Sequence, residues 1–205
     1  MERSNACMQR AAFGILLLTL SAPALAADAH VHGRAALQVA VDGDRLLLEL
    51  NSPLDNLVGF EHAPRNDKQT AAVRRMAERL HQPAALFVPT PEAQCTPASV
   101  TLASEVLDPA LLARQGAVAE AGGSPAKPDG KSQARAHDKG KGAHEAHAAL
   151  TAEIVFRCAR AEKLSSLDVR LFDAFSHFRR IDVQVAGAKK QAAARLTPGS
   201  KRVAW

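Results

Sequence analysis

The chain has 205 residues, of which 47% are hydrophobic and 23% are charged. This composition is typical of one medium-sized globular domain with appendages, and it excludes a fully disordered chain and a multi-pass membrane protein. The net charge of +5 is spread along the sequence, and only 4% of the residues are aromatic. A nucleic-acid-binding protein is therefore disfavoured, because it would need a basic patch or aromatic residues on which bases stack.

Residues 1–26 have the pattern of a secretory signal peptide. Arg3 and Arg10 give a basic start, residues 11–20 form an apolar stretch, and residues 24–26 (Ala-Leu-Ala) provide a small-residue cleavage site. The apolar stretch is shorter than the roughly 20 residues that a membrane-spanning helix needs, which disfavours a retained anchor. We therefore expect a mature, soluble chain that begins at Ala27 and is exported to an oxidising compartment.

The first half of the mature chain predicts a β-hairpin and one helix. Residues 37–50 alternate between apolar and polar side chains on both sides of an Asp-Gly turn, which is the hairpin pattern. A loop is expected over residues 51–64. Asn66 with Gln69 resembles a capping box, and the apolar residues that follow have helical spacing as far as His81. Strands are predicted at residues 84–88 and 98–103.

Residues 116–149 differ from the rest in being rich in glycine, alanine and charged residues, with few large apolar side chains. Such a segment cannot bury enough surface to offset the entropy lost on ordering, so we predict a disordered insertion that captures metal. The insertion divides one domain into residues 27–115 and 150–205. Strand patterns return at residues 150–158, 167–171, 181–185, 191–196 and 202–205. The predicted class is α+β, with a mostly antiparallel β-sheet and one clear helix.

Two cysteines, Cys95 and Cys158, remain once Cys7 has left with the signal peptide. In an oxidising compartment we expect them to form a disulfide. Because they flank the insertion, the bridge should hold its two ends to the sheet. A two-cysteine metal site is the less favoured alternative, since no histidine lies near either cysteine in the sequence.

The histidines occur in three settings that favour metal binding. They are His30 and His32 near the mature start, His62 beside Glu61 in a loop, and His137, His144 and His147 in the insertion. In an extended chain the side chains of His30 and His32 point the same way, and neutral imidazole suits zinc or copper. A solvated N-terminus, a histidine packed in a loop and a plain linker are the respective alternatives. His177 between two phenylalanines is typical of a packed or turn histidine rather than a ligand. No catalytic motif is present, so we do not expect an enzyme.

Several short motifs resemble one known family. Residues 29–33 (Ala-His-Val-His-Gly), residues 52–53 (Ser-Pro) and residues 59–64 (Gly-Phe-Glu-His-Ala-Pro) look like the ZrgA family of periplasmic zinc-uptake proteins. Residues 154–158, 171–172 and 191–198 are similar to the C-terminal half of that family. The resemblance covers essentially the whole mature chain.

The resemblance implies a periplasmic protein that binds Zn²⁺ and helps to deliver it to an import system. Compared with the family, the insertion here has few histidines and many basic residues, so the expected ordered site shifts to His30, His32 and His62. Glu61 would either bind the metal or orient His62. Capture should be reversible, because protons compete with metal for imidazole. The alternatives are a protein that sequesters excess zinc or copper, and a metal-free structural or chaperone-like periplasmic domain.

Overall fold

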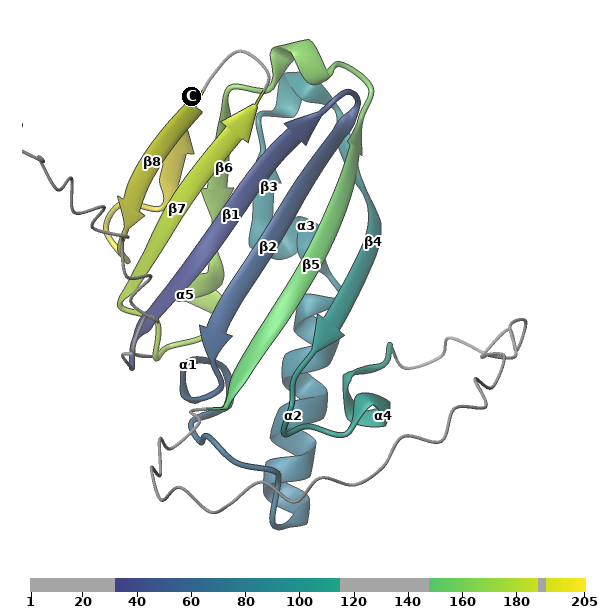
Figure 1. Ribbon diagram of the computed structural model, residues 1–205, viewed down its shortest axis with the longest axis vertical. Helices are drawn as coiled ribbons and strands as arrows, with labels where there is room; N and C mark the ends of the chain where they lie inside the picture. Colours follow the sequence, from purple (N-terminus) through teal and green to yellow (C-terminus); the bar gives the residue numbers. More distant parts are fainter. Residues whose placement is uncertain (1–31, 115–147, 188–190) are drawn as a thin grey trace, which may run out of the picture.

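The structure is a computed structural model that describes residues 32–114, 148–187 and 191–205. These residues form a six-stranded sheet with the order β4-β5-β2-β1-β7-β8 and a three-stranded sheet with the order β3-β6-β9 (Figure 1). The strands are β1 (Arg34–Asp42), β2 (Arg45–Pro53), β3 (Phe87–Pro89), β4 (Cys95–Ala103), β5 (Ala149–Cys158), β6 (Ser166–Val169), β7 (Arg180–Gly187), β8 (Gln191–Leu196) and β9 (Arg202–Ala204).

The helices are short apart from one. They are α1 (Asp55–Val58), α2 (Asp67–Leu80), α3 (Pro83–Leu86), α4 (Pro109–Leu112) and α5 (Leu171–Ala174), with 3-10 turns at Pro91–Ala93 and Ala161–Lys163. No helix in the described part of the chain is long and apolar enough to cross a membrane. The predicted α+β class, with a mostly antiparallel sheet and one clear helix, is confirmed.

The pairing within the large sheet decides which segments meet. β1 and β2 form the predicted antiparallel hairpin, and β2 continues to β5 and then to β4 in antiparallel pairs. On its other side β1 pairs with β7 in parallel, from Arg34 opposite Arg180 to Val41 opposite Gly187. This parallel pair brings the starts of β1 and β7 to the same end of the sheet.

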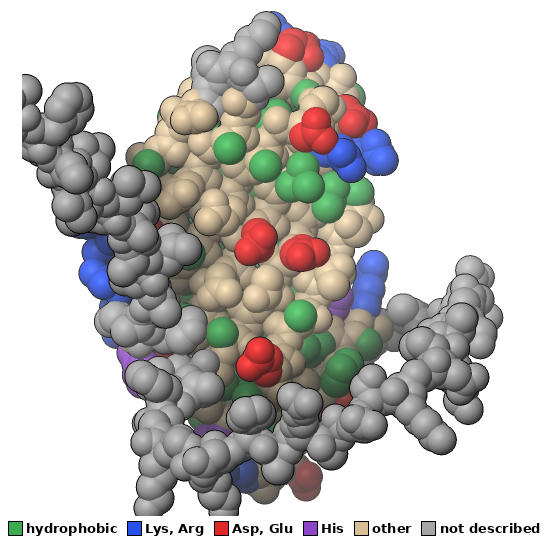
Figure 2. Space-filling view, in the orientation of Figure 1, with side chains coloured by type: hydrophobic (Ala, Val, Ile, Leu, Met, Phe, Trp, Pro, Cys, Tyr) green, Lys and Arg blue, Asp and Glu red, His purple; other side chains and the backbone are tan. Residues whose placement is uncertain are grey.

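One face of the large sheet is buried and the other is open. Alternate residues of the central strands, such as Leu37, Leu48, Ile154 and Val183, are at most 2% exposed. They lie under α2 and the smaller sheet, which Figure 1 shows behind the strands. Figure 2 shows the open face, where hydrophobic side chains are scattered among polar ones. The period of two in the sequence thus follows from this one-sided burial.

Helix α2 begins and packs as its sequence predicts. The Asn66 side chain accepts a hydrogen bond of 3.0 Å from the backbone of Gln69, and the Gln69 side chain accepts one of 2.8 Å from the backbone of Arg65. These bonds satisfy amide groups that the first helical turn leaves without a partner. Val73, Met76 and Leu80 are buried against the core.

Two expectations about local structure are wrong. The segment 51–64 is not all loop, because β2 extends to Pro53 and α1 follows at once. The expected strand at residues 84–88 is instead the helical turn α3 followed by the short strand β3. Pro83 sets a backbone angle suited to the first position of a helix, which explains the turn. Of the expected insertion, residues 116–147 lie outside the described residues, and β5 begins at Ala149.

The predicted disulfide between Cys95 and Cys158 is confirmed. The two cysteines face each other where β4 begins and β5 ends, whereas Ala103 and Thr151 face each other at the opposite end of this strand pair. The chain leaves β4 toward residue 115 and returns to β5 at that opposite end. The expectation that the bridge holds the two ends of the insertion is therefore wrong, and the bridge instead fixes the far end of the β4–β5 pair.

The last strand is anchored by an ion pair. Arg202 on β9 donates two hydrogen bonds of 2.7 Å to Asp168 on β6. These bonds favour the ionised carboxylate and hold the pKa of Asp168 below its ordinary value. The pair adds a side-chain link to the backbone pairing between the two strands.

Candidate functional site

Three segments meet at one end of the large sheet. His32 precedes β1 and His177 precedes β7, and the parallel register places Arg34 opposite Arg180 just after them. β2 runs antiparallel to β1, so it ends at this same end of the sheet and leads into α1, which begins at Asp55. The topology therefore brings side chains more than 140 residues apart in the sequence into one place.

A buried asparagine fixes the backbone beside His32. The Asn56 side chain is in α1, and the residue is 1% exposed. Its oxygen accepts a hydrogen bond of 2.7 Å from the Gly33 amide, while its nitrogen donates to the Arg34 carbonyl at 2.7 Å and to the Ser52 hydroxyl at 3.1 Å. The Gly33 carbonyl in turn accepts a hydrogen bond of 2.8 Å from the Arg179 amide. Because buried polar groups are costly to leave unpaired, these bonds hold the three segments in one arrangement.

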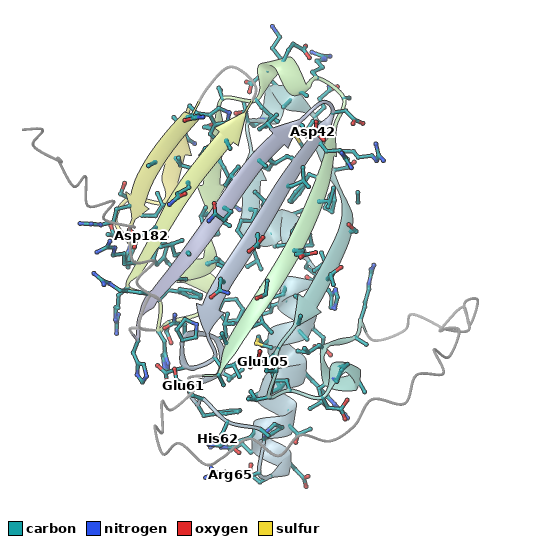
Figure 3. The ribbon with its side chains drawn as sticks, in the orientation of Figure 1. Asp42, Glu61, His62, Arg65, Glu105 and Asp182 are labelled. Carbon is teal, nitrogen blue, oxygen red and sulfur yellow. A yellow bond between two sulfur atoms is a disulfide. The ribbon has the colours of Figure 1, made fainter. Side chains whose placement is uncertain are left out.

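Two imidazoles and two carboxylates lie together at this end. The Nε2 atom of His32 is 3.3 Å from Oε1 of Glu61, and its Nδ1 atom is 3.7 Å from Oδ2 of Asp55. The same Oδ2 atom is 3.9 Å from Nδ1 of His177. We call His32, Asp55, Glu61 and His177 the histidine–carboxylate cluster. The Glu61 side chain is only 17% exposed, and Figure 3 shows it beside the end of the sheet.

The tautomer of His177 follows from its hydrogen bond. Its Nδ1 atom lies 2.9 Å from the backbone carbonyl of Asp55, which can only accept, so Nδ1 carries the proton. The Nε2 atom then keeps its lone pair and is able to bind a metal ion. The His177 side chain is 50% exposed. His177 lies in a turn, which agrees with the expectation of a packed or turn histidine, and Phe175 and Phe178 near it are buried.

The other sequence-predicted ligands are placed differently. Glu61 lies in the cluster, but His62 stacks on the ring of Phe60 with 5.1 Å between ring centroids. Its Nδ1 atom donates to the Ala63 carbonyl at 2.8 Å. In the view of Figure 3, His62 lies beyond Glu61 and farther from the sheet. The remaining predicted ligands lie outside the described residues; these are His30, His137, His144 and His147.

The protonation state of His32 decides what its two ring nitrogens present to the neighbouring carboxylates. A protonated His32 would pair with both carboxylates, whereas a neutral His32 with its proton facing Asp55 would direct a lone pair toward Glu61. Among residues 32–114, 148–187 and 191–205, no three His, Cys, Asp or Glu side chains are grouped closely enough to hold a metal ion. The cluster therefore provides two neighbouring ligand atoms, on His32 and Glu61, rather than a complete coordination sphere.

Two members of the cluster, Asp55 and His177, have only weak signals in the sequence. Asp55 is the first residue of a four-residue helix that was expected to be loop, so nothing marked its carboxylate as pointing to another segment. The sequence around His177 suggested packing, because both neighbouring phenylalanines are apolar. His32 lies two residues before β1, and His177 lies three residues before β7. With the parallel pairing of β1 and β7 known, this similar spacing would have placed the two histidines side by side.

Gly59 has a positive φ and lies close to the His177 ring. It ends α1 with a φ of +81°, and a Cβ atom at this position would lie 3.3 Å from Cε1 of His177. We expect Gly59→Ala to lower the melting temperature more than Gly43→Ala. Gly43 also has a positive φ, of +60°, but has open space around it. Both variants carry backbone strain, on the order of 1 kcal/mol, so the difference isolates the contact with His177. Equal losses in thermal unfolding would show that this contact is unimportant.

Comparison with protein families supports the sequence resemblance. No curated protein is matched by the chain. Among protein families, residues 29–205 match the one described as "ZrgA family zinc uptake protein". This range includes the whole described structure and all four members of the histidine–carboxylate cluster. The match confirms the resemblance seen in the short motifs of the sequence, and the chain belongs to the ZrgA family of zinc uptake proteins.

Proposed function

We propose that this protein binds zinc reversibly in the periplasm, at the histidine–carboxylate cluster, and supplies it to an import system. Membership of a zinc uptake family supports the choice of zinc and the role in uptake rather than detoxification. The observation that carries the proposed site is the distance of 3.3 Å between Nε2 of His32 and Oε1 of Glu61.

This distance suits two ligands of one zinc ion. Zinc binds nitrogen and oxygen at about 2.0–2.2 Å with tetrahedral geometry, so two neighbouring ligand atoms are about 3.3–3.6 Å apart. In the metal-free protein Nε2 of His32 can donate a hydrogen bond to Glu61, and a zinc ion would replace the shared proton. His32 and Glu61 are thus already spaced for an ion to bind between them.

The other cluster members would orient or complete the coordination. Asp55 is near Nδ1 of both His32 and His177, and a carboxylate in this position fixes the tautomer and raises the basicity of a metal-binding imidazole. Nε2 of His177 and the imidazole of His30, two residues before His32, are the candidates for a third protein ligand. The His32 side chain is 61% exposed, which suits an ion that must enter and leave.

The remaining parts of the proposal rest on the sequence. A signal peptide at residues 1–26 would export the chain, and the disulfide supports an oxidising compartment such as the periplasm. His137, His144 and His147 would add transient binding sites beside the ordered one. No residue is proposed to act in catalysis.

Calorimetric titration of zinc into the metal-free, tag-free mature protein tests this function. We expect Glu61→Gln to weaken zinc binding by about tenfold or more, because it removes the anionic ligand while keeping the size of the side chain. Glu49→Gln is the matched control, since Glu49 is exposed on β2, outside the cluster. The proposal is wrong if the wild-type protein does not bind zinc at micromolar concentrations. If both variants weaken binding equally, general charge rather than the cluster is responsible.

A further inference from the structure

A pocket of about 270 Å³ lies next to the histidine–carboxylate cluster, and His177 forms part of its wall. The other walls come from α1, from one face of α2 and from the segment that follows α5. Its volume is near the lower limit of small-molecule pockets, which is about 300 Å³. The pocket is therefore large enough for a compact organic molecule rather than only for water.

The pocket is lined by two arginines and is therefore positively charged. Arg75 and Arg79, one helical turn apart on α2, both line it, and no aspartate or glutamate is among its lining residues. Two like charges at this spacing repel each other on a helix. Arg79 is held in place, since it donates to the Ala174 carbonyl and lies over the ring of Phe175 at 5.9 Å. An anion between the two guanidinium groups would offset their repulsion.

The accessible part of the remaining lining is mostly polar. Leu57, Met76 and Phe175 are at most 8% exposed, and the exposed Ser176 provides a hydroxyl group that can form a hydrogen bond. Guanidinium groups bind planar carboxylates through paired hydrogen bonds, so two of them favour a molecule with two carboxylates.

We propose that this pocket binds a small organic dicarboxylate and that the protein accepts zinc together with such an acid. The association with zinc rests on the proposed function, whereas the anion pocket does not. A carboxylate oxygen beside His177 could fill a coordination position that the protein leaves open, and the ion would add positive charge next to the pocket.

The first experiment uses calorimetric titration of succinate into the metal-free mature protein. We expect binding that Arg75→Gln weakens by about tenfold or more, as expected for a lost charge-assisted hydrogen bond. Arg74→Gln is the matched control, because Arg74 is exposed on α2 and does not line the pocket. Acetate should bind more weakly than succinate. If succinate does not bind, or if the two variants weaken binding equally, the proposal that this pocket binds a dicarboxylate is wrong.

The second experiment repeats the titration with zinc-saturated protein. Zinc should tighten succinate binding by at least about fivefold, since two ligands that favour each other have a reciprocal coupling. An unchanged succinate affinity would overturn the joint binding. If the protein binds succinate but no zinc, the proposed function fails while the pocket stands. If it binds zinc but no succinate, only the pocket is wrong.

Discussion

The His177→Ala variant should bind zinc about tenfold more weakly than the wild-type protein, whereas His62→Ala should bind it with unchanged affinity. Nε2 of His177 keeps its lone pair beside the cluster, because Nδ1 donates to the Asp55 carbonyl. The His62 ring is instead occupied by stacking on Phe60 and lies outside the cluster. Losing one nitrogen ligand, or an outer partner of a ligand, commonly costs about 10–100-fold in metal affinity.

Competition titration against a zinc-binding dye measures both affinities on one scale. His177 contacts Gly59 and Asp55, so its loss could also loosen the fold. A second variant, His177→Gln, keeps a polar side chain able to donate to the Asp55 carbonyl but lacks the imidazole. Weak zinc binding by both His177 variants with an unchanged unfolding curve would support a ligand role. If His62→Ala is the weaker binder, the site lies on the loop rather than in the cluster.

Much of the fold could be predicted because its determinants are local. The β1–β2 hairpin follows from alternation around the Asp42-Gly43 turn, and α2 follows from its capping residues and helical spacing. These patterns involve neighbours within a few residues, so the sequence alone carries them. The disulfide could also be predicted, because the number of cysteines left after export allowed one pairing.

The candidate site could be predicted only in part, because it depends on distant pairing. His32 and Glu61 stood out through their motifs, and the structure places them in contact. The contribution of His177 depends on the parallel pairing of β1 with β7, which no local pattern encodes. Asp55 depends on a four-residue helix that is too short to give a periodic signal. Glu61 and His62 are adjacent and were expected to act together. The chain bends here, so the Glu61 side chain contacts His32 whereas the His62 ring stacks on Phe60.

Removing the disulfide should lower the free energy of unfolding by about 2–5 kcal/mol. The bridge joins residues separated by 63 positions, so it restricts a long loop of the unfolded chain. β4 is an edge strand that pairs only with β5 in the described sheet, and the bridge fixes their shared end. The variant Cys95→Ser/Cys158→Ser, unfolded in urea, gives the loss directly. Reducing agent should reproduce this loss in the wild-type protein and leave the variant unchanged.

The same variant should retain the zinc affinity of the wild-type protein when it is folded. The bridge lies where β5 ends, near Arg157 opposite Arg45, whereas the cluster lies at the end where Ala149 is opposite Pro53. About 3.3 Å per residue along a strand separates the two by most of the length of β5. A loss of zinc affinity in folded, bridge-free protein would show that the edge strand and the cluster are coupled.

For the stability prediction, a loss of unfolding free energy below about 1 kcal/mol would mean that the unfolded chain is already restricted without the bridge.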